Sequence, residues 1–324
     1  MNNNISISLP LQEIKRSVKL MGNNFDIIVV ARDPDRAAEK IEIAIKEIKR
    51  IEALLTTFSD NSETSRINAA AGISAVKVSQ EVYQLIERSQ RISTVTDGAF
   101  DISYGSLDKS LWNFDRSMTS LPDSKTARQM VRLINYRNIE LNPHESTVFL
   151  RQKGMRIGFG GIGKGYAADM AKTMMLKEGV ESGIINASGD LVTWGNQANG
   201  KSWTIGIADP DNAQLPFSYL DISNVAIATS GNYEKYVVID GKKYSHTINP
   251  KTGLPVTGIK SVTIITANAE LADAMATPVT VMGMRAGLNL INQMHQIECI
   301  IIDDNNNIHT SKNIHLHEAA EQYH

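Results

Sequence analysis

Apolar side chains recur along this chain with two different periods, and these periods predict helices and strands. Over residues 34–57 isoleucine and leucine return every three or four positions, the spacing of one buried helix face, with lysine and glutamate opposite. Asp33 and Pro34 supply the N-cap and first-turn proline that begin such a helix. Further amphipathic helices are expected over residues 81–95 and 124–134.

Short runs rich in β-branched residues predict strands joined by short links. The expected strands are residues 25–31, 139–141, 147–150, 155–157, 183–187, 203–207, 220–222, 225–229, 236–239, 243–246 and 260–266. Asp240 and Gly241 form a hairpin signal between two of these runs. Because strands that follow one another over short links pair antiparallel, we expect an α+β fold of mostly antiparallel sheets with packed helices.

Length and periodicity together predict how the chain is divided. At 324 residues it is longer than one small core requires, so two lobes or one large α+β unit is expected. Residues 1–20 carry no clear period and are expected to be a flexible lead-in. Residues 21–310 are expected to form a single domain, and residues 311–324 a polar C-terminal tail.

The composition is that of a globular protein, with 42% hydrophobic and 21% charged residues. A net charge of −2 without a basic run argues against nucleic-acid binding, and no apolar run approaches the ~18 residues of a membrane span. Residues 1–20 lack a signal-peptide core and a lipid-acceptor cysteine, which favours a cytoplasmic protein unless a leader was removed. The single cysteine, Cys299, lies in an apolar run and is expected in the core.

Candidate chemistry concentrates in residues 158–165, which hold five glycines directly before a predicted helix over residues 166–179. Glycines allow the backbone to bend sharply and to approach a ligand closely. Exposed N–H groups that lead into a helix N-terminus form an anion site, and Lys164 adds a positive charge there. The stretch therefore predicts a phosphate or pyrophosphate site.

Two known phosphate motifs fit part of this stretch. Gly158 to Lys164 matches the first seven positions of a P-loop, but Gly165 stands where a Ser or Thr hydroxyl holds Mg²⁺. Gly158, Gly160 and Gly163 also match a dinucleotide-binding turn, but no acidic residue ends a second strand about twenty positions later. A metal on this phosphate must therefore take its anionic ligands from elsewhere.

A predicted helix over residues 269–278 offers such ligands. Asp273 and Thr277 are four positions apart, so both side chains project from one helix face. A carboxylate and a hydroxyl suit Mg²⁺, which takes few protein ligands. The alternative is a helix whose polar face happens to present both. Pro278 is expected to kink or end this helix.

Residues 96–105 carry neither a helical nor a strand period. Small residues, two aspartates and two aromatic residues after a helix suit a binding loop. An ordinary turn with Phe100 filling a gap is the alternative.

Taken together, seven groups of residues occur in the order in which they occur in one protein family. They are Met21-Gly22, Phe58-Ser59-Asp60 with Ser65-Arg66-Ile67-Asn68, Gly98-Ala99-Phe100-Asp101, Gly160-Gly161-Ile162-Gly163-Lys164-Gly165-Tyr166-Ala167, Ala228-Thr229-Ser230-Gly231-Asn232-Tyr233-Glu234, His246-Thr247-Ile248-Asn249-Pro250-Lys251-Thr252-Gly253 and Ala272-Asp273-Ala274-Met275-Ala276-Thr277. Over residues 21–309 the chain resembles the FAD:protein FMN transferases, the ApbE family.

The resemblance implies a Mg²⁺-dependent enzyme built of two interlocked lobes with the site between them. Such an enzyme binds FAD, moves its FMN half onto a Thr or Ser hydroxyl of an acceptor flavoprotein through a phosphodiester bond, and releases AMP. Phosphoryl chemistry of this kind requires chiefly positioning and charge neutralisation. An FAD pyrophosphatase that yields FMN and AMP, or a non-enzymatic flavin-binding protein, are the alternatives.

The resemblance also implies roles for individual residues. The metal ligands are Gly163, Asp273, Ala276 and Thr277. The FAD contacts are Met21, Phe58, Ala99, Phe100, Asp101, Gly160, Lys164, Tyr166, His246, Thr247 and Ile248. Phe58 is expected to stack on the ligand and Asp101 to accept a hydrogen bond from adenine or ribose. The catalytic residues are Asp273, Thr277 and His246, which is either a general base for the acceptor hydroxyl or a structural histidine bonded to a carbonyl.

The chain departs from the pattern common in the family at three places. Gly158-Phe159 stands where members commonly carry Asp-Leu, and Asn249 stands where many carry Asp. Pro278 directly follows Thr277, which is unusual. These departures bear on reaction rate and acceptor choice more than on the class of reaction.

Overall fold

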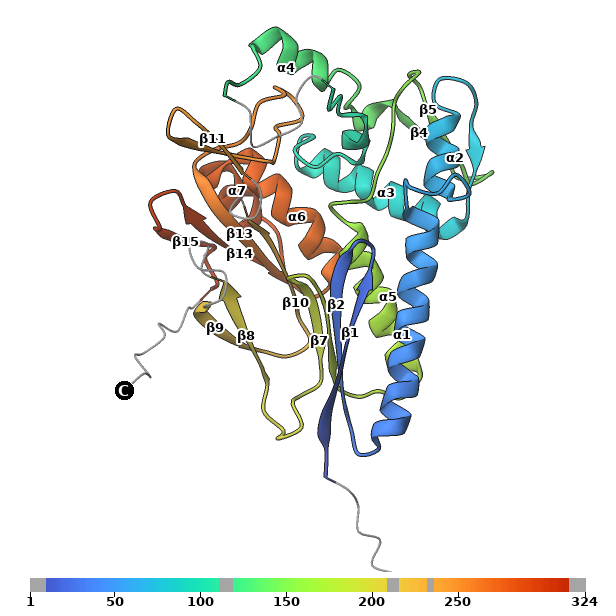
Figure 1. Cartoon of the computed structure of the whole chain (residues 1–324), viewed down its shortest axis with the longest axis vertical. Helices are drawn as coiled ribbons and strands as arrows, with labels where there is room; N and C mark the ends of the chain where they lie inside the picture. Colours follow the sequence, from blue (N-terminus) through green and yellow to red (C-terminus); the bar gives the residue numbers. More distant parts are fainter. Residues whose placement is uncertain (1–9, 111–118, 209–215, 232–235, 315–324) are drawn as a thin grey trace, which may run out of the picture.

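The computed structural model describes residues 10–110, 119–208, 216–231 and 236–314 (Figure 1). The helices are α1 (Pro34–Leu55), α2 (Glu63–Ala69), α3 (Gln80–Val95), α4 (Ser124–Met130), α5 (Gly163–Lys177), α6 (Ala269–Met282) and α7 (Met284–Ile291), with the 3-10 turns η1 (Ile102–Ser106) and η2 (Tyr136–Asn138). The strands are β1 (Gln12–Leu20), β2 (Asn23–Ala31), β3 (Val76–Lys77), β4 (Ile139–Asn142), β5 (Thr147–Leu150), β6 (Gly183–Ala187), β7 (Asp190–Trp194), β8 (Trp203–Ala208), β9 (Pro216–Ile222), β10 (Ala226–Gly231), β11 (Tyr236–Ile239), β12 (Lys242–Ser245), β13 (Ile259–Thr266), β14 (Ile297–Asp303) and β15 (Ile308–Thr310).

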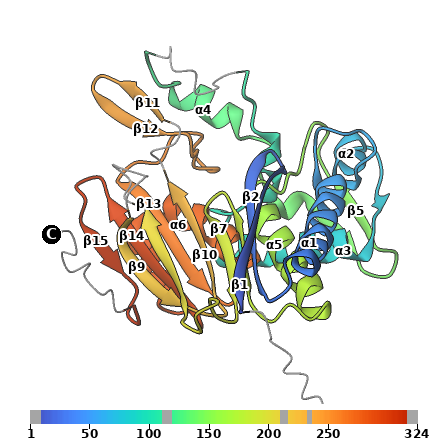
Figure 2. The same cartoon turned by 60° about the horizontal axis from the view of Figure 1, so that its bottom comes forward.

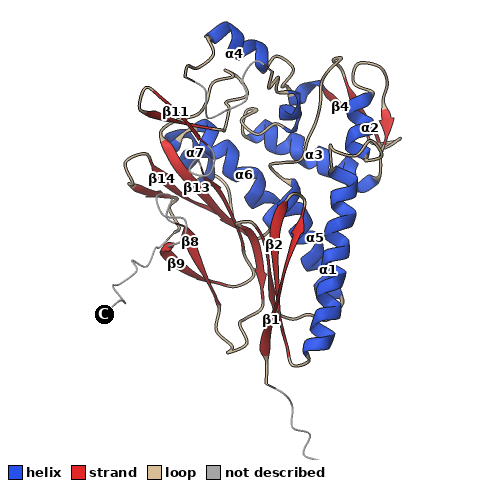
Figure 3. Cartoon of the chain, in the orientation of Figure 1, coloured by secondary structure: helices blue, strands red, loops and turns tan. Residues whose placement is uncertain are grey.

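An eight-stranded sheet in the order β1-β2-β6-β7-β10-β13-β14-β15 forms the centre of the fold (Figure 3). Each neighbouring pair in it is antiparallel. Helices α1 and α5 lie side by side against the sheet, and α6 packs on α5 and on β10 and β13 (Figures 1 and 2). The prediction of an α+β fold with antiparallel sheets is confirmed, while the division into two interlocked lobes stays a prediction.

The two faces of the sheet follow from the alternation of side chains along each strand. In β6, Ile185 joins the large apolar cluster beneath the helices, whereas Ile184 points to the opposite face. There it meets Trp203 of the β8–β9 hairpin, which covers that side. The middle strands of the sheet are buried on both faces and give the helices a fixed base.

Helix α1 forms as its pattern predicts. The side chain of Asp33 accepts hydrogen bonds from the backbone amides of Asp35 and Arg36 at 3.0 and 3.2 Å, which caps the helix at Pro34. Its stripe of apolar residues is buried against the sheet and α5. Cys299 is fully buried in β14, as expected.

The expected flexible lead-in is wrong for residues 12–20, which form strand β1. The strand pairs with β2 along its whole length, from Gln12 opposite Ala31 to Leu20 opposite Asn23. It lies at the edge of the sheet with most side chains exposed, so its residues show no hydrophobic period. Charged side chains on an edge strand discourage pairing with another chain. Residues 1–9 lie outside the described residues.

The expected strand over residues 155–157 does not form, because side chains take its backbone bonds. The side chain of Asn68 donates to the Ile157 carbonyl at 3.0 Å and accepts from the Ile157 amide at 2.7 Å. The Ser106 hydroxyl bonds both the amide and the carbonyl of Arg156 in the same way. These side-chain bonds take the place of strand pairing, and no described strand pairs with the segment.

Two expectations near the C-terminus also need correction. Pro278 does not end α6, which continues to Met282. A proline φ is compatible with a helix, and the missing N–H of Pro278 removes only one bond, to the Ala274 carbonyl. The residue is buried. The predicted tail begins later than residue 311, because Ser311 is buried and exchanges hydrogen bonds with Cys299. Residues 315–324 lie outside the described residues.

Within the described part of the chain, no helix combines the length and the apolar character that crossing a membrane requires.

Candidate functional site

A cavity of about 590 Å³ brings together nine of the predicted site residues. They are Phe58, Ala99, Phe100, Asp101, Gly160, His246, Thr247, Ile248 and Thr277. These residues come from the turn after α1, the loop after α3, the glycine-rich turn, the segment after β12, and α6. Residues far apart in the sequence thus form one site of the size of a cofactor pocket.

The charge of this cavity favours an anionic ligand. Lys109 and Arg156 line it with exposed basic side chains. Of the described lining residues only Asp101 is acidic, and its carboxylate is bonded to protein donors. The described lining is therefore net positive, which favours an anionic ligand because opposite charges steer a ligand into a cleft.

Phe58 presents an open aromatic face at this cavity. Its side chain is 98% exposed, which is unusual for a phenyl ring. The turn that carries it is fixed, because the Phe58 amide donates to Thr56 Oγ1 at 3.1 Å and the Ser62 hydroxyl donates to the Thr56 carbonyl at 2.6 Å. The ring is therefore available for stacking, and its contact with a ligand stays a prediction.

The loop after α3 both ends the helix and forms a wall of the cavity. Asp97 and Gly98 have positive φ values of 49° and 76°, and the Gly98 amide donates to the Ser93 carbonyl at 2.7 Å. Phe100 is buried to 6% exposure, and its amide donates to Thr96 Oγ1 at 3.1 Å. Phe100 therefore packs into the fold, as expected for an ordinary turn, and it also lines the cavity, so that ligand binding by this loop stays a prediction.

The carboxylate of Asp101 is already satisfied by the protein. Oδ1 accepts from the Ser103 amide at 2.8 Å and from its hydroxyl at 2.6 Å, and Oδ2 accepts from the Tyr136 amide at 2.7 Å. Burial raises the pKa of this carboxyl, and the three donors oppose that rise. The geometry favours a structural role for Asp101 over the predicted bond to adenine or ribose.

The glycine-rich turn reaches α5 through internal hydrogen bonds. The Gly158 amide donates to the Ile102 carbonyl at 2.9 Å, and the Gly163 amide donates to the Phe159 carbonyl at 2.6 Å. Gly160 and Gly161 line the cavity between these anchors. Only part of the turn therefore faces the cavity. At Gly158-Phe159, where family members commonly carry Asp-Leu, the bond from Gly158 to Ile102 helps to hold the turn.

The side chain of Asp273, on α6, lies against the first turn of α5, where α5 and α6 approach closely. Its Oδ2 accepts from the Gly165 amide at 3.0 Å. A Cβ on Gly165 would lie only 2.0 Å from the Ala269 carbonyl oxygen, so no larger residue fits at position 165 without a shift. This explains why the hydroxyl of a P-loop is absent here. Asp273 is 6% exposed, so it is not part of a solvated polar face.

The surroundings of Asp273 already hold a cation. The ammonium of Lys164 forms an ion pair with Asp190 and lies 3.6 Å from Asp273 Oδ1. Burial raises the pKa of Asp273, which the Lys164 charge opposes and the Asp190 charge reinforces. A buried carboxylate that is ionised without a nearby positive charge destabilises the protein.

Asp273 and Thr277 supply a carboxylate and a hydroxyl, oxygen donors of the kind that Mg²⁺ takes, and the binding of Mg²⁺ by them stays a prediction. Thr277, one turn beyond Asp273 on α6, lines the cavity. Among the described residues no group of three His, Cys, Asp or Glu side chains is arranged to hold an ion, so hydroxyl, carbonyl, water and phosphate oxygens must complete a shell. The Ala276 carbonyl accepts the Thr280 hydroxyl at 3.0 Å within the helix, which disfavours its predicted role as a ligand.

Comparison with known proteins shows the family of this chain. The model of the ApbE family matches residues 21–301. The chain belongs to the ApbE family. It is 33% identical over 294 residues to the FAD:protein FMN transferase of Klebsiella pneumoniae (strain 342), covering 90% of each chain, and 27% identical over 325 residues to that of Treponema pallidum (strain Nichols), covering 94% of this chain and 88% of the relative. The crystal structure of the ApbE protein from Thermotoga maritima matches with a TM-score of 0.83 and 29% identity, over 93% of this chain and 97% of that one.

Three residues predicted to contact FAD in this ApbE protein are not among the described residues that line the cavity. The Tyr166 hydroxyl donates to Glu81 at 2.6 Å, and the guanidinium of Arg88 lies 5.6 Å from the centre of the Tyr166 ring. Met21 packs beneath the glycine-rich turn, with its Cε 3.6 Å from where a Gly163 Cβ would lie. Lys164 pairs with carboxylates, as described above. In this structure these side chains support the site rather than line it.

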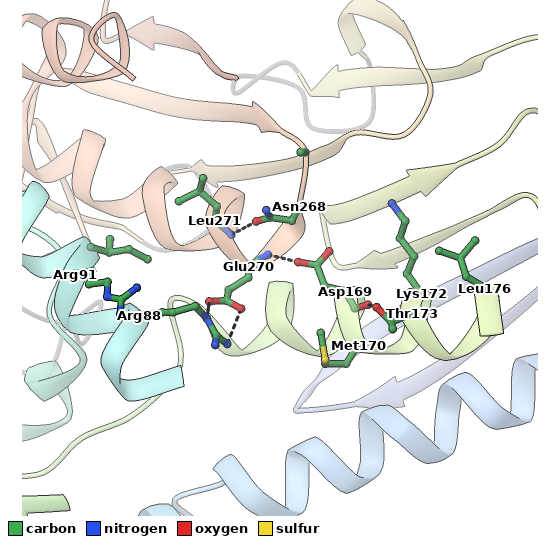
Figure 4. A pocket seen from close by; sticks show the side chains of 12 residues that line it. Arg88, Arg91, Asp169, Met170, Lys172, Thr173, Leu176, Asn268, Glu270 and Leu271 are labelled. Carbon is green, nitrogen blue, oxygen red and sulfur yellow. Dashed lines mark hydrogen bonds and ion pairs between the residues drawn. The ribbon is translucent and has the colours of Figure 1, made fainter. Parts of the chain in front are cut away.

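The N-terminus of α6 is tied to α5 and α3, which positions Asp273 and Thr277. The Asp169 carboxylate accepts from the Ala269 and Glu270 amides at 2.9 and 2.8 Å. The Arg88 guanidinium, on α3, donates two hydrogen bonds of 2.6 and 3.0 Å to the Glu270 carboxylate (Figure 4). A second cavity of about 570 Å³ lies beside these residues, and none of the predicted site residues is among the described ones that line it.

Sequence reasoning missed several residues that shape the site. Asp190 follows a Ser188-Gly189 turn, and only a fold brings it to Lys164. Asn68 occurs in one of the family motifs, but nothing local shows that it bonds Ile157. Lys109 and Arg156 are isolated basic residues, and a charge count alone does not place them in a cavity. The motif residues 232–234 lie outside the described residues.

Proposed function

We propose that this protein is a Mg²⁺-dependent FAD:protein FMN transferase. The observation that carries the proposal is the placement of Asp273 against the first turn of α5, with Thr277 one turn on in the wall of a cavity that also holds Phe58 and His246. The relatives that match over most of the chain bear this enzyme's name. The basic lining of the cavity suits the pyrophosphate of FAD.

The residues of the site divide the work of binding. Phe58 offers a stacking face, and Gly160 and Gly161 let the backbone approach the pyrophosphate closely. Asp273, Thr277 and the Gly163 carbonyl would hold Mg²⁺. When bound, the ion offsets negative charge that grows on the pyrophosphate as its bond breaks. Lys109 and Arg156 neutralise the remaining phosphate charge.

The transfer itself moves one phosphoryl linkage. The hydroxyl oxygen of an acceptor Thr or Ser forms a bond to the FMN phosphorus, and the bond from that phosphorus to the oxygen of AMP breaks. The hydroxyl proton passes to a base, and AMP leaves with the electron pair. His246 is our candidate for that base, because it is exposed directly after β12 and lines the cavity.

The experiment incubates the full chain with FAD and Mg²⁺, with and without an acceptor flavoprotein that carries the Thr/Ser flavinylation motif. We expect covalent flavin on the acceptor and AMP in equal amounts, and neither product after chelation of the metal. AMP without acceptor dependence, and without covalent flavin, would instead indicate the pyrophosphatase. Tight FAD binding without AMP at any Mg²⁺ concentration would indicate a binding protein.

A variant pair tests the metal assignment in the same assay. Asp273→Ala is expected to abolish metal-dependent AMP release while the fold persists, as checked by circular dichroism. The matched control is Asp35→Ala, which removes an exposed carboxylate in the first turn of α1. Full activity of Asp273→Ala would contradict the assignment of Asp273 as a metal ligand.

A further inference from the structure

Lys164 lies between two carboxylates that have little access to solvent. Its ammonium contacts Asp190 Oδ2 and lies 3.6 Å from Asp273 Oδ1. Both carboxylate side chains are 7% exposed, and that of Lys164 is 23% exposed. The other oxygen of Asp273 is held by the Gly165 amide. The three charged groups therefore form one compact cluster beside the first turn of α5.

The charges of this cluster do not balance. Two carboxylates with little access to solvent face a single ammonium. If both are ionised, one negative charge is left without a partner in a region where unpaired charge is costly. A divalent ion at Asp273 would supply the missing positive charge. It would also meet the ammonium that already stands close to the same carboxylate, and two cations at one carboxylate repel each other.

We propose that Lys164 serves as an internal cation, which means that its ammonium supplies the positive charge beside Asp273 when no metal is bound. Asp190 then holds this ammonium away from Asp273 when a divalent ion binds there. Asp190 thereby becomes a positioning residue of the metal site. The inference rests on the metal site of the proposed function and does not depend on the identity of the acceptor.

The local structure suits such an exchange. Asp190 begins β7 and pairs with Ala187 of β6 across a tight turn, in which Ser188 and Gly189 have positive φ values of 54° and 101°. The backbone of Asp190 is therefore fixed by the sheet. The lysine stem is long and flexible, so its ammonium can shift between the two carboxylates by rotation about side-chain bonds alone.

The inference predicts opposite effects for two variants. Lys164→Met removes the competing cation and should tighten binding of a divalent ion about tenfold, while the metal-free protein melts at a lower temperature. Asp190→Asn leaves the ammonium with Asp273 as its sole carboxylate partner in the cluster and should weaken binding of the ion about tenfold.

The double variant Lys164→Met/Asp190→Asn tests whether Asp190 acts by holding Lys164 or by attracting the metal ion directly with its own charge. If Asp190 acts by holding Lys164, Asp190→Asn should change metal affinity little once Lys164 is methionine, because no ammonium remains to be redirected. If Asp190 acts only through its own charge, it should weaken binding equally in both backgrounds. An equal loss in both backgrounds would overturn the inference.

The experiment titrates the metal-free full chain with Mn²⁺ in the absence of FAD and counts free Mn²⁺ by electron paramagnetic resonance. Asp273→Asn, which should lose the site, identifies the signal. Lys177→Met removes an exposed lysine from the last turn of the same helix and should change nothing. Should Lys164→Met fail to fold, Asp190→Asn retains the Lys164–Asp273 pair, and unchanged or tighter Mn²⁺ binding in it would overturn the inference.

The results also separate this inference from the proposed function. FMN transfer that is lost in Asp273→Ala, with Mn²⁺ affinities insensitive to Lys164 and Asp190, would overturn the internal-cation role and leave the transferase intact. The expected Mn²⁺ affinities in a protein that transfers no FMN would support the internal cation and count against the transferase.

Discussion

The amide of Gly165 donates a 3.0 Å hydrogen bond to Oδ2 of Asp273, which joins two helices whose bonded residues are 108 positions apart in the chain. The bond is possible because Gly165 has no side chain, which lets α6 approach α5 closely. Asp169, further along α5, accepts the first amides of α6 and holds the same contact from the other side. The orientation of the carboxylate at residue 273 therefore depends on the spacing between two helices.

Replacing Gly165 with alanine should force these helices apart. Its Cβ would lie 2.0 Å from the Ala269 carbonyl oxygen and 2.9 Å from Asp273 Cβ. We expect a loss of about 1–3 kcal/mol in the free energy of unfolding, as for other overpacked contacts, measured by urea denaturation. Gly160→Ala is the matched control, because nothing lies within 4 Å of its Cβ position. Equal stability of Gly165→Ala and wild type would contradict the close approach.

Asp101→Asn distinguishes a structural carboxylate from a ligand contact. The amide side chain places an NH₂ group against donors that now point at carboxylate oxygens, so we expect a loss of about 1–3 kcal/mol of folding stability. Asp108→Asn is the control, because Asp108 bonds the amide and hydroxyl of Ser110 in the same pattern but on the surface. Weaker FAD binding at unchanged stability would restore the predicted contact to adenine or ribose.

Some of this site could be predicted from the sequence because the signal was local. Asp273 and Thr277 lie on one face of a helix whatever that helix packs against. The apolar stripe of α1 predicted its buried face for the same reason. A run of glycines before a helix predicts a backbone that can approach a ligand closely, whatever the rest of the chain does. Residues 160 and 161 line the cavity.

The rest depends on contacts between distant segments, which no local pattern shows. Asn68 bonds Ile157 across 89 residues, so side chains hold the segment that was expected to be a strand. Tyr166 falls in a family motif, but the position of Glu81 directs its hydroxyl away from the cavity. Strand β1 carries no hydrophobic period because the edge of the sheet leaves most of its side chains in solvent.

The stability of the α1–α3–α5 contact should depend on pH through Glu81. Arg50 donates to both of its oxygens at 2.7 and 2.8 Å, and these bonds, together with the Tyr166 hydroxyl, hold the pKa of Glu81 below its ordinary value of 4.5. A depressed folded-state pKa contributes stability above the ordinary value and loses it as pH falls through the folded-state value.

Glu81→Gln should therefore lower the urea midpoint at neutral pH, and its difference from wild type should shrink as the pH falls below about 4.5. The control is Glu87→Gln, which removes a more exposed carboxylate that pairs with Arg91 on the same helix. A difference between Glu81→Gln and wild type that stays constant down to pH 3 would show that the charge of Glu81 contributes nothing.

Cys299 should be inert in the native protein. It lies in β14 with no exposed surface, and burial raises the pKa of its thiol to about 12. Since the thiolate is the reactive form, iodoacetamide at pH 8 should label the folded chain slowly and the urea-denatured chain completely. As the chain has one cysteine, mass spectrometry should count a single adduct. Rapid native labelling would show that this strand opens readily.

His246→Ala tests the assignment of the general base. His246 follows β12 at the cavity, where an acceptor hydroxyl must meet the FMN phosphorus. If its imidazole takes the hydroxyl proton, the rate of transfer from bound FAD should fall by about 10²–10⁴-fold while FAD affinity changes little. Single-turnover kinetics at saturating FAD measures this rate constant separately from binding.

The pH dependence of that rate separates a base from a structural histidine. Only neutral imidazole accepts a proton, so the wild-type rate should decline on acidification, and this decline should disappear in His246→Ala. His144→Ala, which removes an exposed histidine from the turn between β4 and β5, should keep the wild-type profile. If FAD affinity falls and the rate from bound FAD does not, His246 binds the substrate, and the hydroxyl proton must leave by another group.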